Sequence, residues 1–184
     1  MRKLVYYVAI SLDGFISRAD GRFDFFPDDD PQYFSAYADS LREFDTVLMG
    51  RHTFEVGTRA GVTNPYVPYG PGQLYVFSRT HPDVEDPAVQ MVRENAGAFV
   101  RELKAREGRN LYLCGGAELA TALFDENLID EVIVKLNPVM VGQGKSLLTR
   151  AFGSIRLKLT ETRIFESGVM FLRYRVTPTT PTPI

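Results

Sequence analysis

The stretch Leu111-Tyr112-Leu113-Cys114-Gly115-Gly116-Ala117 places a continuous apolar run directly before a pair of glycines. An apolar run of this kind is typical of a strand that is buried on both faces of a sheet. Two adjacent glycines allow unusual backbone dihedrals and let the chain pack flat against a ligand such as a pyrophosphate. An ordinary tight turn between a strand and a helix fits equally well, because the full dinucleotide fingerprint requires a third glycine.

Two other apolar runs end in the same manner. Val47-Leu48-Met49 leads into Gly50-Arg51-His52-Thr53, and Leu74-Tyr75-Val76-Phe77 leads into Ser78-Arg79-Thr80. In open α/β sheets, ligands bind outside the carboxyl ends of the strands. Three such strand ends in one chain therefore predict convergence on one polyanionic ligand, and a dinucleotide is the natural candidate.

The segment after the second run has the chemistry of a phosphate site. A helix that opens at Gly50 offers free backbone N–H groups and the positive end of its dipole. Arg51 can bind a phosphate through two hydrogen bonds, and Thr53 can donate its hydroxyl. The alternative is a plain helix start with a surface arginine.

Ser78 and Arg79 form the pairing expected around a ribose 2′-phosphate, which favours NADPH over NADH. The alternative for this segment is a polar turn. The phosphate-binding interpretation of this segment is supported by its occurrence together with the other two strand ends.

The predicted elements alternate between strand and helix and end in a hairpin. Strands are expected at 3–11, 46–49, 74–77, 89–92, 110–114, 131–136, 158–165 and 170–176. Helices are expected to begin at Pro31, near Arg51, after Asn95 and at Ala117. This order predicts a single α/β domain over 1–176, with a mostly parallel sheet, helices on both faces and an antiparallel C-terminal hairpin. The Pro/Thr-rich tail 177–184 is expected to be disordered.

Composition excludes several classes of protein. The chain has 184 residues, 45% of them hydrophobic and 24% charged, which suits one globular domain. A net charge of −2 argues against general nucleic-acid binding. One cysteine and two histidines cannot build a Cys/His zinc cluster. No run approaches the ~20 apolar residues of a membrane helix, and the apolar N-terminus is interpreted as a strand, so a cytoplasmic location is expected.

Two charged positions are candidates for contact with a substrate. Asp30 follows the aromatic loop that ends at Phe26, and an acid beside aromatic rings can hold a protonated heterocycle or relay a proton. The alternative is a solvated turn in which Asp30 caps the helix. Lys135 interrupts an apolar strand, where it faces either a pocket or the outer side of an edge strand. The two histidines have no serine and acid partners at a spacing that would indicate a hydrolase.

The ordered set of segments resembles the dihydrofolate reductase-like superfamily, in particular the C-terminal reductase domain of the riboflavin-biosynthesis deaminase/reductase. The matching segments are 11–16, 47–55, 77–80, 113–117 and 130–134, so the resemblance spans nearly the whole chain. It implies a three-layer sandwich, NADPH as cofactor, a stand-alone reductase and a homodimer formed through the late strands. It also implies a cis peptide bond between Gly115 and Gly116, as in relatives that reduce folate.

The resemblance assigns roles to individual residues. The cofactor-binding set would be Ala9, Ile16, Gly50, Arg51, Thr53, Ser78, Arg79, Gly115, Gly116 and Ala117. In this set the backbones of Ala9 and Ile16 would hold the nicotinamide carboxamide. Asp30 would be the catalytic acid, with Phe26, Phe34 and Lys135 facing the substrate.

The expected function is hydride transfer from NADPH to a small heterocyclic or imine-type substrate, pterin-like or pyrimidine-like. The chain contains no tryptophan, which departs from the pocket of folate reductases and argues against folate itself. The alternative is a non-catalytic NADPH-binding module that retains the fold.

Overall fold

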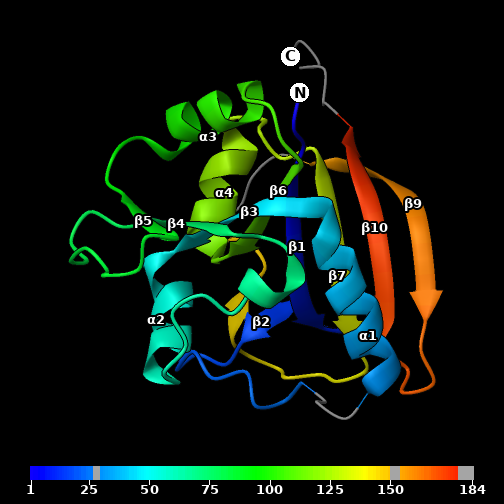
Figure 1. Ribbon diagram of the computed structural model, residues 1–184. Coiled ribbons are helices and arrows are strands. Elements are labelled where there is room, and N and C mark those ends of the chain that lie inside the picture. The colour runs from blue at the N-terminus through cyan, green and yellow to red at the C-terminus, as the bar shows by residue number, and fades with distance from the viewer. Residues whose placement is uncertain (27–29, 150–153, 178–184) are drawn as a thin grey trace.

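The computed structural model of the chain describes residues 1–26, 30–149 and 154–177 (Figure 1). The main strands are β1 (Leu4–Ser11), β3 (Phe44–Gly50), β4 (Gln73–Phe77), β5 (Val89–Val92), β6 (Asn110–Gly115), β7 (Glu131–Asn137), β9 (Arg156–Ile164) and β10 (Met170–Thr177). A small second sheet contains β2 (Phe15–Ser17) and β8 (Lys145–Ser146). The helices are α1 (Pro31–Ser40), α2 (Arg51–Arg59), α3 (Ala96–Ala105) and α4 (Ala117–Asp125), with short 3₁₀ turns η1 (Leu41–Glu43) and η2 (Val67–Tyr69).

The eight main strands form one sheet in the order β5-β4-β3-β6-β1-β7-β10-β9. The pairings from β5 to β7 are parallel, whereas β10 pairs antiparallel with both β7 and β9. β1 lies between β6 and β7, so its continuous apolar sequence is explained by burial on both faces. The predicted fold class, a mostly parallel α/β sheet with a late antiparallel pair, is confirmed.

Helices cover both faces of the sheet, which gives three layers. α3 and α4 contribute Leu103 and Leu123 to a core shared with Leu4 and Leu113 of the strands. The opposite face packs Phe54 of α2 into a second core, and Tyr37 of α1 packs against that core. Figure 1 shows α3 and α4 together, and α1 over the part of the sheet that holds β7 and β10.

Two of the helices begin with a side-chain cap and two do not. The Asp30 carboxylate accepts a hydrogen bond from the Tyr33 N–H (2.8 Å), and Asn95 accepts one from the Ala98 N–H (2.9 Å). These caps confirm the starts predicted for α1 and α3. The N-cap residues of α2 and α4 are Gly50 and Gly116, which have no side chain to satisfy the first N–H groups.

The structure differs from the sequence prediction at several element boundaries and in its short strands. α2 continues past Gly57 to Arg59, supported by an Arg51–Glu55 ion pair within the helix. Thr177 is the last residue of β10 and not the first residue of the tail; residues 178–184 lie outside the described part of the chain. β8 was not predicted, because two residues are too short to carry a hydrophobic pattern.

Within the described ranges, no helix is both long and apolar enough to cross a membrane.

Candidate functional site

The three predicted strand ends meet at one edge of the sheet. Gly50 pairs in register with Phe77 on β4, and Met49 pairs with Gly115 on β6. The segments that begin with Arg51, Ser78 and Gly116 therefore leave the sheet side by side. A Cβ built on Gly50 would lie 3.6 Å from the Gly116 nitrogen, so two of the turns are in direct contact. The strand pairing confirms that the three strand ends meet at one edge of the sheet.

Two helix N-termini open at this point without a side-chain cap. α2 starts at Gly50 and α4 starts at Gly116, and each helix has nine residues. Their first N–H groups and their positive dipole ends act together there, which is an arrangement that attracts an anion. The Thr53 hydroxyl oxygen lies beside the glycine pair, 3.6 and 3.4 Å from the positions of a Cβ on Gly115 and on Gly116. Gly115 has φ of +140°, a conformation that favours glycine, and its bond to Gly116 is cis.

Two arginines lie on the segments that leave this edge, Arg51 at the start of α2 and Arg79 after β4. The Arg51 guanidinium donates to the Glu55 carboxylate at 2.8 Å and lies 3.3 Å from a ring nitrogen of His52. Arg79 is exposed on the turn after β4. Before it, the Ser78 hydroxyl oxygen accepts the N–H groups of Thr80 and His81 at 3.3 and 3.0 Å, which fixes the shape of the turn.

A second cluster joins the ends of β1 and β7. Ala9 pairs in register with Lys135, and Ile16 lies on β2, which contacts β1. The fully buried Asn137 amide donates to the carbonyl oxygens of Ile10 (2.9 Å) and Lys135 (3.2 Å). Within the described residues, the Asn137 Oδ1 is buried without a hydrogen-bond partner. An acceptor is therefore available beside the backbone of β1.

Asp13 ties the turn after β1 to the loop after β7. Its carboxylate accepts the Ser11 hydroxyl at 2.6 Å and the Gly142 N–H at 2.8 Å. These two hydrogen bonds lower the pKa of Asp13, the one from Ser11 having the larger effect. These contacts give Asp13 the role of a turn-forming residue.

Asp30 and Lys135 lie in one polar cluster under α1. One oxygen of Asp30 caps the helix, and the other accepts the hydroxyl of Ser167 from the turn between β9 and β10. The Ser167 hydrogen bond, then the Tyr33 N–H, and the charge of Lys135 all lower the pKa of Asp30. At neutral pH Asp30 is therefore a carboxylate.

Lys135 is buried against aromatic rings. It is 6% exposed, and its Nζ lies 4.1 Å from the ring centre of Tyr33 and 5.8 Å from that of Phe34. These distances are those of cation–π contacts. Lys135 thus faces α1 and not the outer side of an edge strand. The described ring contact of Phe26 is with Phe25 and not with Lys135, the two ring centres being 4.3 Å apart.

Replacing Ser167 with alanine is expected to lower the Tm at pH 7 by about 2–4 °C, because a hydrogen bond to the Asp30 carboxylate is lost. The loss also moves the folded-state pKa of Asp30 upward. Since a depressed pKa stabilises the fold only above the unfolded-state value near 4, the difference from wild type should shrink as the pH falls below about 4. Thermal unfolding between pH 3 and pH 7 measures this.

The exposed Ser154 supplies the control for this prediction, since Ser154→Ala should leave the pH profile unchanged. A Ser167→Ala protein whose Tm follows wild type at every pH would show that the Ser167–Asp30 contact does not contribute to stability.

Three of the residues in these clusters were not identified from the sequence. Ser167 reaches Asp30 across 137 positions, and Asn137 bridges to Ile10 across 127 positions. Tyr66 comes from the loop after α2 and places its hydroxyl 3.1 Å from the Cys114 sulfur, next to the Gly115 turn. Burial raises the pKa of the Cys114 thiol, which agrees with a core residue. The only local hint was Asn137 before a proline at a strand end.

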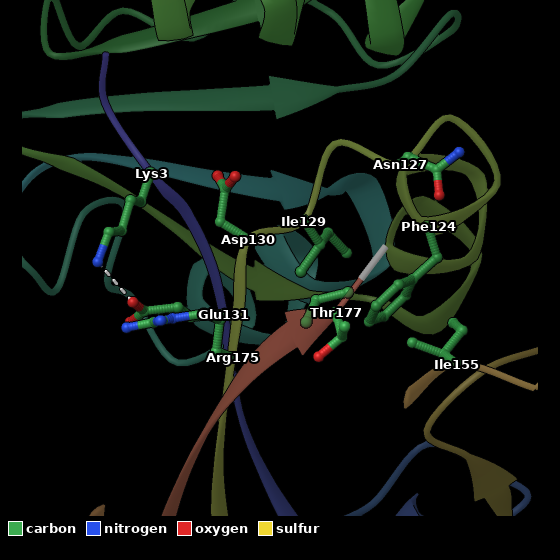
Figure 2. A pocket seen from close by; sticks show the side chains of 10 residues that line it. Lys3, Phe124, Asn127, Ile129, Asp130, Glu131, Ile155, Arg175 and Thr177 are labelled. Atoms are coloured by element: carbon green, nitrogen blue, oxygen red, sulfur yellow. Dashed lines mark hydrogen bonds and ion pairs between the residues drawn. The ribbon is translucent and has the colours of Figure 1, made fainter. Parts of the chain in front are cut away.

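A pocket of about 260 Å³ lies at the opposite edge of the sheet (Figure 2). Lys3 at the start of the chain, Glu131 at the start of β7 and Arg175 near the end of β10 contribute to its wall. Glu131 accepts a hydrogen bond from Lys3 at 2.6 Å, and Asp130 binds the Leu4 N–H at 2.7 Å. The acids of this pocket therefore have protein partners, and the pocket is separate from the edge that holds the glycine turns.

Solved structures share this fold. A protein from Shewanella sp. PV-4 superposes with a TM-score of 0.78 at 22% identity, over 96% of this chain and 99% of the other. RibD of Acinetobacter baumannii superposes with a TM-score of 0.73 at 19% identity, over 96% of this chain and 58% of that protein. The deaminase/reductase of Thermotoga maritima, whose reductase acts on 5-amino-6-(5-phosphoribosylamino)uracil, superposes with a TM-score of 0.69 at 15% identity. The superposition covers 96% of this chain and 57% of that protein.

Sequence relatives cover almost the full chain. YwjB of Bacillus subtilis (strain 168) is 35% identical over 168 residues, which is 91% of this chain and 95% of YwjB. YyaP of the same organism is 31% identical over 187 residues, covering 94% of each chain. The family model of the RibD C-terminal domain matches residues 2–171. The chain therefore belongs to the RibD C-terminal domain family.

Proposed function

We propose that this protein is an NADPH-dependent reductase that transfers a hydride to a small heterocyclic or imine-type substrate, pterin-like or pyrimidine-like. The observation that carries the proposal is the contact between two uncapped helix starts, at Gly50 and Gly116, within an arginine-bearing sheet edge. Membership of a family of reductase domains supports the reaction class.

The residues at this edge fit the cofactor. The N–H groups at the starts of α2 and α4 and the Thr53 hydroxyl would bind the pyrophosphate, with Ala117 as the first residue of α4. Arg51 would bind the cofactor phosphates from the start of α2, and Ser78 and Arg79 would flank the phosphate on the adenosine ribose. The backbones of Ala9 and Ile16 would hold the carboxamide, next to the buried acceptor of Asn137.

When bound, the reduced nicotinamide supplies the hydride, and the protein supplies position and exclusion of water. Phe26, Phe34 and Lys135 would face the substrate from the loop before α1, from α1 and from β7. For Asp30 we propose a positioning role: its carboxylate holds the start of α1 and the charge of Lys135 in place. We also propose a cytoplasmic location for this protein.

NADPH at a hundred times its Kd is expected to raise the Tm by about 5–10 °C, because ligand binding to the folded state stabilises it by roughly 2.7 kcal/mol. NADH at the same concentration should give a much smaller shift, since it lacks the 2′-phosphate. Thermal unfolding with each cofactor measures the difference. Equal, negligible shifts would reject the proposal. NADPH binding without oxidation across pterins, pyrimidines and imines would instead indicate a non-catalytic module.

We also propose a homodimer formed through the late strands. β9 is one of the two edge strands of the sheet, and three of its apolar side chains are exposed: Leu157 (45%), Leu159 (50%) and Ile164 (70%). An exposed edge with apolar side chains favours pairing with another chain.

Light scattering is expected to give twice the 20.7 kDa chain mass for wild type and a single-chain mass for Leu159→Glu. A buried charge at the interface would cost more than a small interface gains. Val62→Glu alters an apolar side chain of similar exposure (42%) on a loop and should stay dimeric. Wild type at the single-chain mass would exclude the dimer.

A further inference from the structure

The hairpin of β9 and β10 has one apolar face and one charged face. Successive side chains along a strand alternate between the two faces, and side chains directly opposite each other in an antiparallel pair share a face. Leu172 and Val176 of β10 pack against the core that α3 and α4 cover, whereas Phe171 belongs to the core on the side of α1 and α2. The even-numbered side chains of β10 therefore lie on the face of the sheet that carries α3 and α4, here called the α3/α4 face.

A shift in the pairing brings the exposed apolar side chains of β9 onto the same face. Leu157 and Leu159 have odd numbers and Ile164 has an even one, so an unbroken strand would place them on opposite faces. The register of the hairpin shifts by one residue between Arg173 and Tyr174, as at a β-bulge. All three apolar side chains are thereby opposite even-numbered residues of β10, and they form an apolar strip with them on the α3/α4 face.

The charged side chains of the hairpin lie on the other face. Each of them is at an odd-numbered position of β10 or is opposite one. The set is Arg156, Lys158, Glu161, Arg163, Arg173 and Arg175. The apolar strip thus contains no charged side chain from either strand. Depletion of charge is typical of the core of a protein interface, whereas an edge hairpin that faces only water has no reason to separate its charges in this way.

The helices on this side of the sheet leave the strip open. α4 packs against β3 and β6, which are separated from the hairpin by β1 and β7 in the strand order. Figure 1 shows β9 and β10 at the side of the molecule away from α3 and α4. Ile164 and Leu159 are 70% and 50% exposed. An exposed apolar strip of this kind favours contact with another protein surface.

We infer that the apolar strip packs face to face against the same strip of a second copy of the chain. The inference rests on the homodimer included in the proposed function and specifies its contact. Two sheets stack through the α3/α4 faces of their hairpins, and the two β9 strands are not hydrogen-bonded edge to edge. A two-fold interface brings a patch against its own copy, so a patch with charges of one sign would repel itself. The uncharged strip meets its copy without that repulsion, and it offers nothing to a partner that binds through charge.

Two substitutions that introduce the same carboxylate on opposite faces of β9 test the inference. Ile164→Glu places the carboxylate in the strip, where burial in the interface is costly, and light scattering should give the single-chain mass of 20.7 kDa. Lys158→Glu places it on the charged face, at an exposed position of the same strand, and should keep twice that mass. Circular dichroism of both variants should match wild type, because exposed side chains change the fold little.

A proline substitution separates face packing from edge pairing. The Phe165 N–H donates to the Val169 carbonyl oxygen at the end of the hairpin (2.9 Å). Backbone groups that point to the partner strand and away from it alternate along an antiparallel strand, so the Thr162 N–H points away from β10. Thr162→Pro removes this donor, which an edge strand tolerates, and the variant should remain dimeric.

The results that would overturn the inference are a dimeric Ile164→Glu, a single-chain Lys158→Glu, or a folded Thr162→Pro of single-chain mass, which would indicate edge pairing. The two carboxylate variants decide the result independently if Thr162→Pro does not fold. Wild type at the single-chain mass would mean that the strip contacts a different surface, and it would overturn the inference together with the homodimer.

The reductase proposal is tested separately by the Tm shift with NADPH. Because β1, β7 and β10 separate β9 from the strands that lead into Gly50 and Gly116, Ile164→Glu should show the same shift as wild type. Absence of the shift in both proteins would count against the reductase and not against the contact between the strips.

Discussion

Replacing Gly50 with alanine is expected to lower the affinity for NADPH about a hundredfold and to leave the fold intact. The backbone of Gly50 has φ of −79°, which any residue adopts, and the nearest atoms to an added Cβ are the Gly116 nitrogen at 3.6 Å and the Gly115 oxygen at 3.9 Å. These are ordinary contacts, so the protein should tolerate the methyl group. The same methyl group occupies the space where two helix starts expose their N–H groups to phosphate.

The loss of two charge-assisted hydrogen bonds to phosphate corresponds to about a hundredfold loss of affinity. Calorimetric titration with NADPH measures the affinity, and the Tm without cofactor should stay within about 2 °C of wild type. Gly72→Ala is the matched control, because a Cβ there meets nothing within 4 Å and its φ is not positive. If Gly50→Ala binds NADPH as tightly as wild type, the phosphates do not lie between these two helices.

Arg79→Ala is expected to remove most of the preference for NADPH over NADH. Arg79 is exposed two residues after the end of β4, and β4 is the neighbour of the strand that leads into α2. A guanidinium at this position would form charge-assisted hydrogen bonds with the 2′-phosphate that distinguishes the two cofactors. The Kd for NADPH should therefore rise about 10–100-fold while the Kd for NADH stays constant.

Arg42→Ala provides the control for this charge change. Arg42 is 76% exposed at the other edge of the sheet, before β3 begins, and its only described ion pair is with Asp39 at 3.7 Å. The Arg42→Ala substitution should leave the dissociation constants for NADPH and NADH unchanged. Parallel losses of NADPH and NADH affinity in Arg79→Ala would show that this side chain acts on a part common to both cofactors.

Much of the sheet edge that holds the glycine turns could be predicted because its signals are local. An apolar run that ends in glycine and is followed by a helix describes a strand, a turn and an uncapped helix start within about ten residues. The N-caps Asp30 and Asn95 were recognisable for the same reason, since a cap bonds to a residue three positions along the chain. Parallel pairing then brings the turns to one edge.

The cluster of Asp30 and Lys135 under α1 was harder to predict. Asp30 could be recognised as a cap, but the Ser167 hydroxyl that completes its hydrogen bonding comes from a turn near the other end of the chain. For Lys135, the sequence left open whether the side chain faced a pocket or the outside. β10 pairs with β7, so β7 is an internal strand, and α1 covers the face of the sheet on which Lys135 lies.

By itself, the sequence determined the fold class, the starts of α1 and α3 and the glycine turns, because hydrophobic period, capping and turn chemistry act between near neighbours. Only the tertiary structure decided that Gly50 contacts Gly116, that Ser167 binds Asp30 and that Lys135 lies over Tyr33. Those contacts depend on which strands become neighbours in the sheet. That order is set by the packing of the two cores as a whole, and no short stretch of sequence carries it.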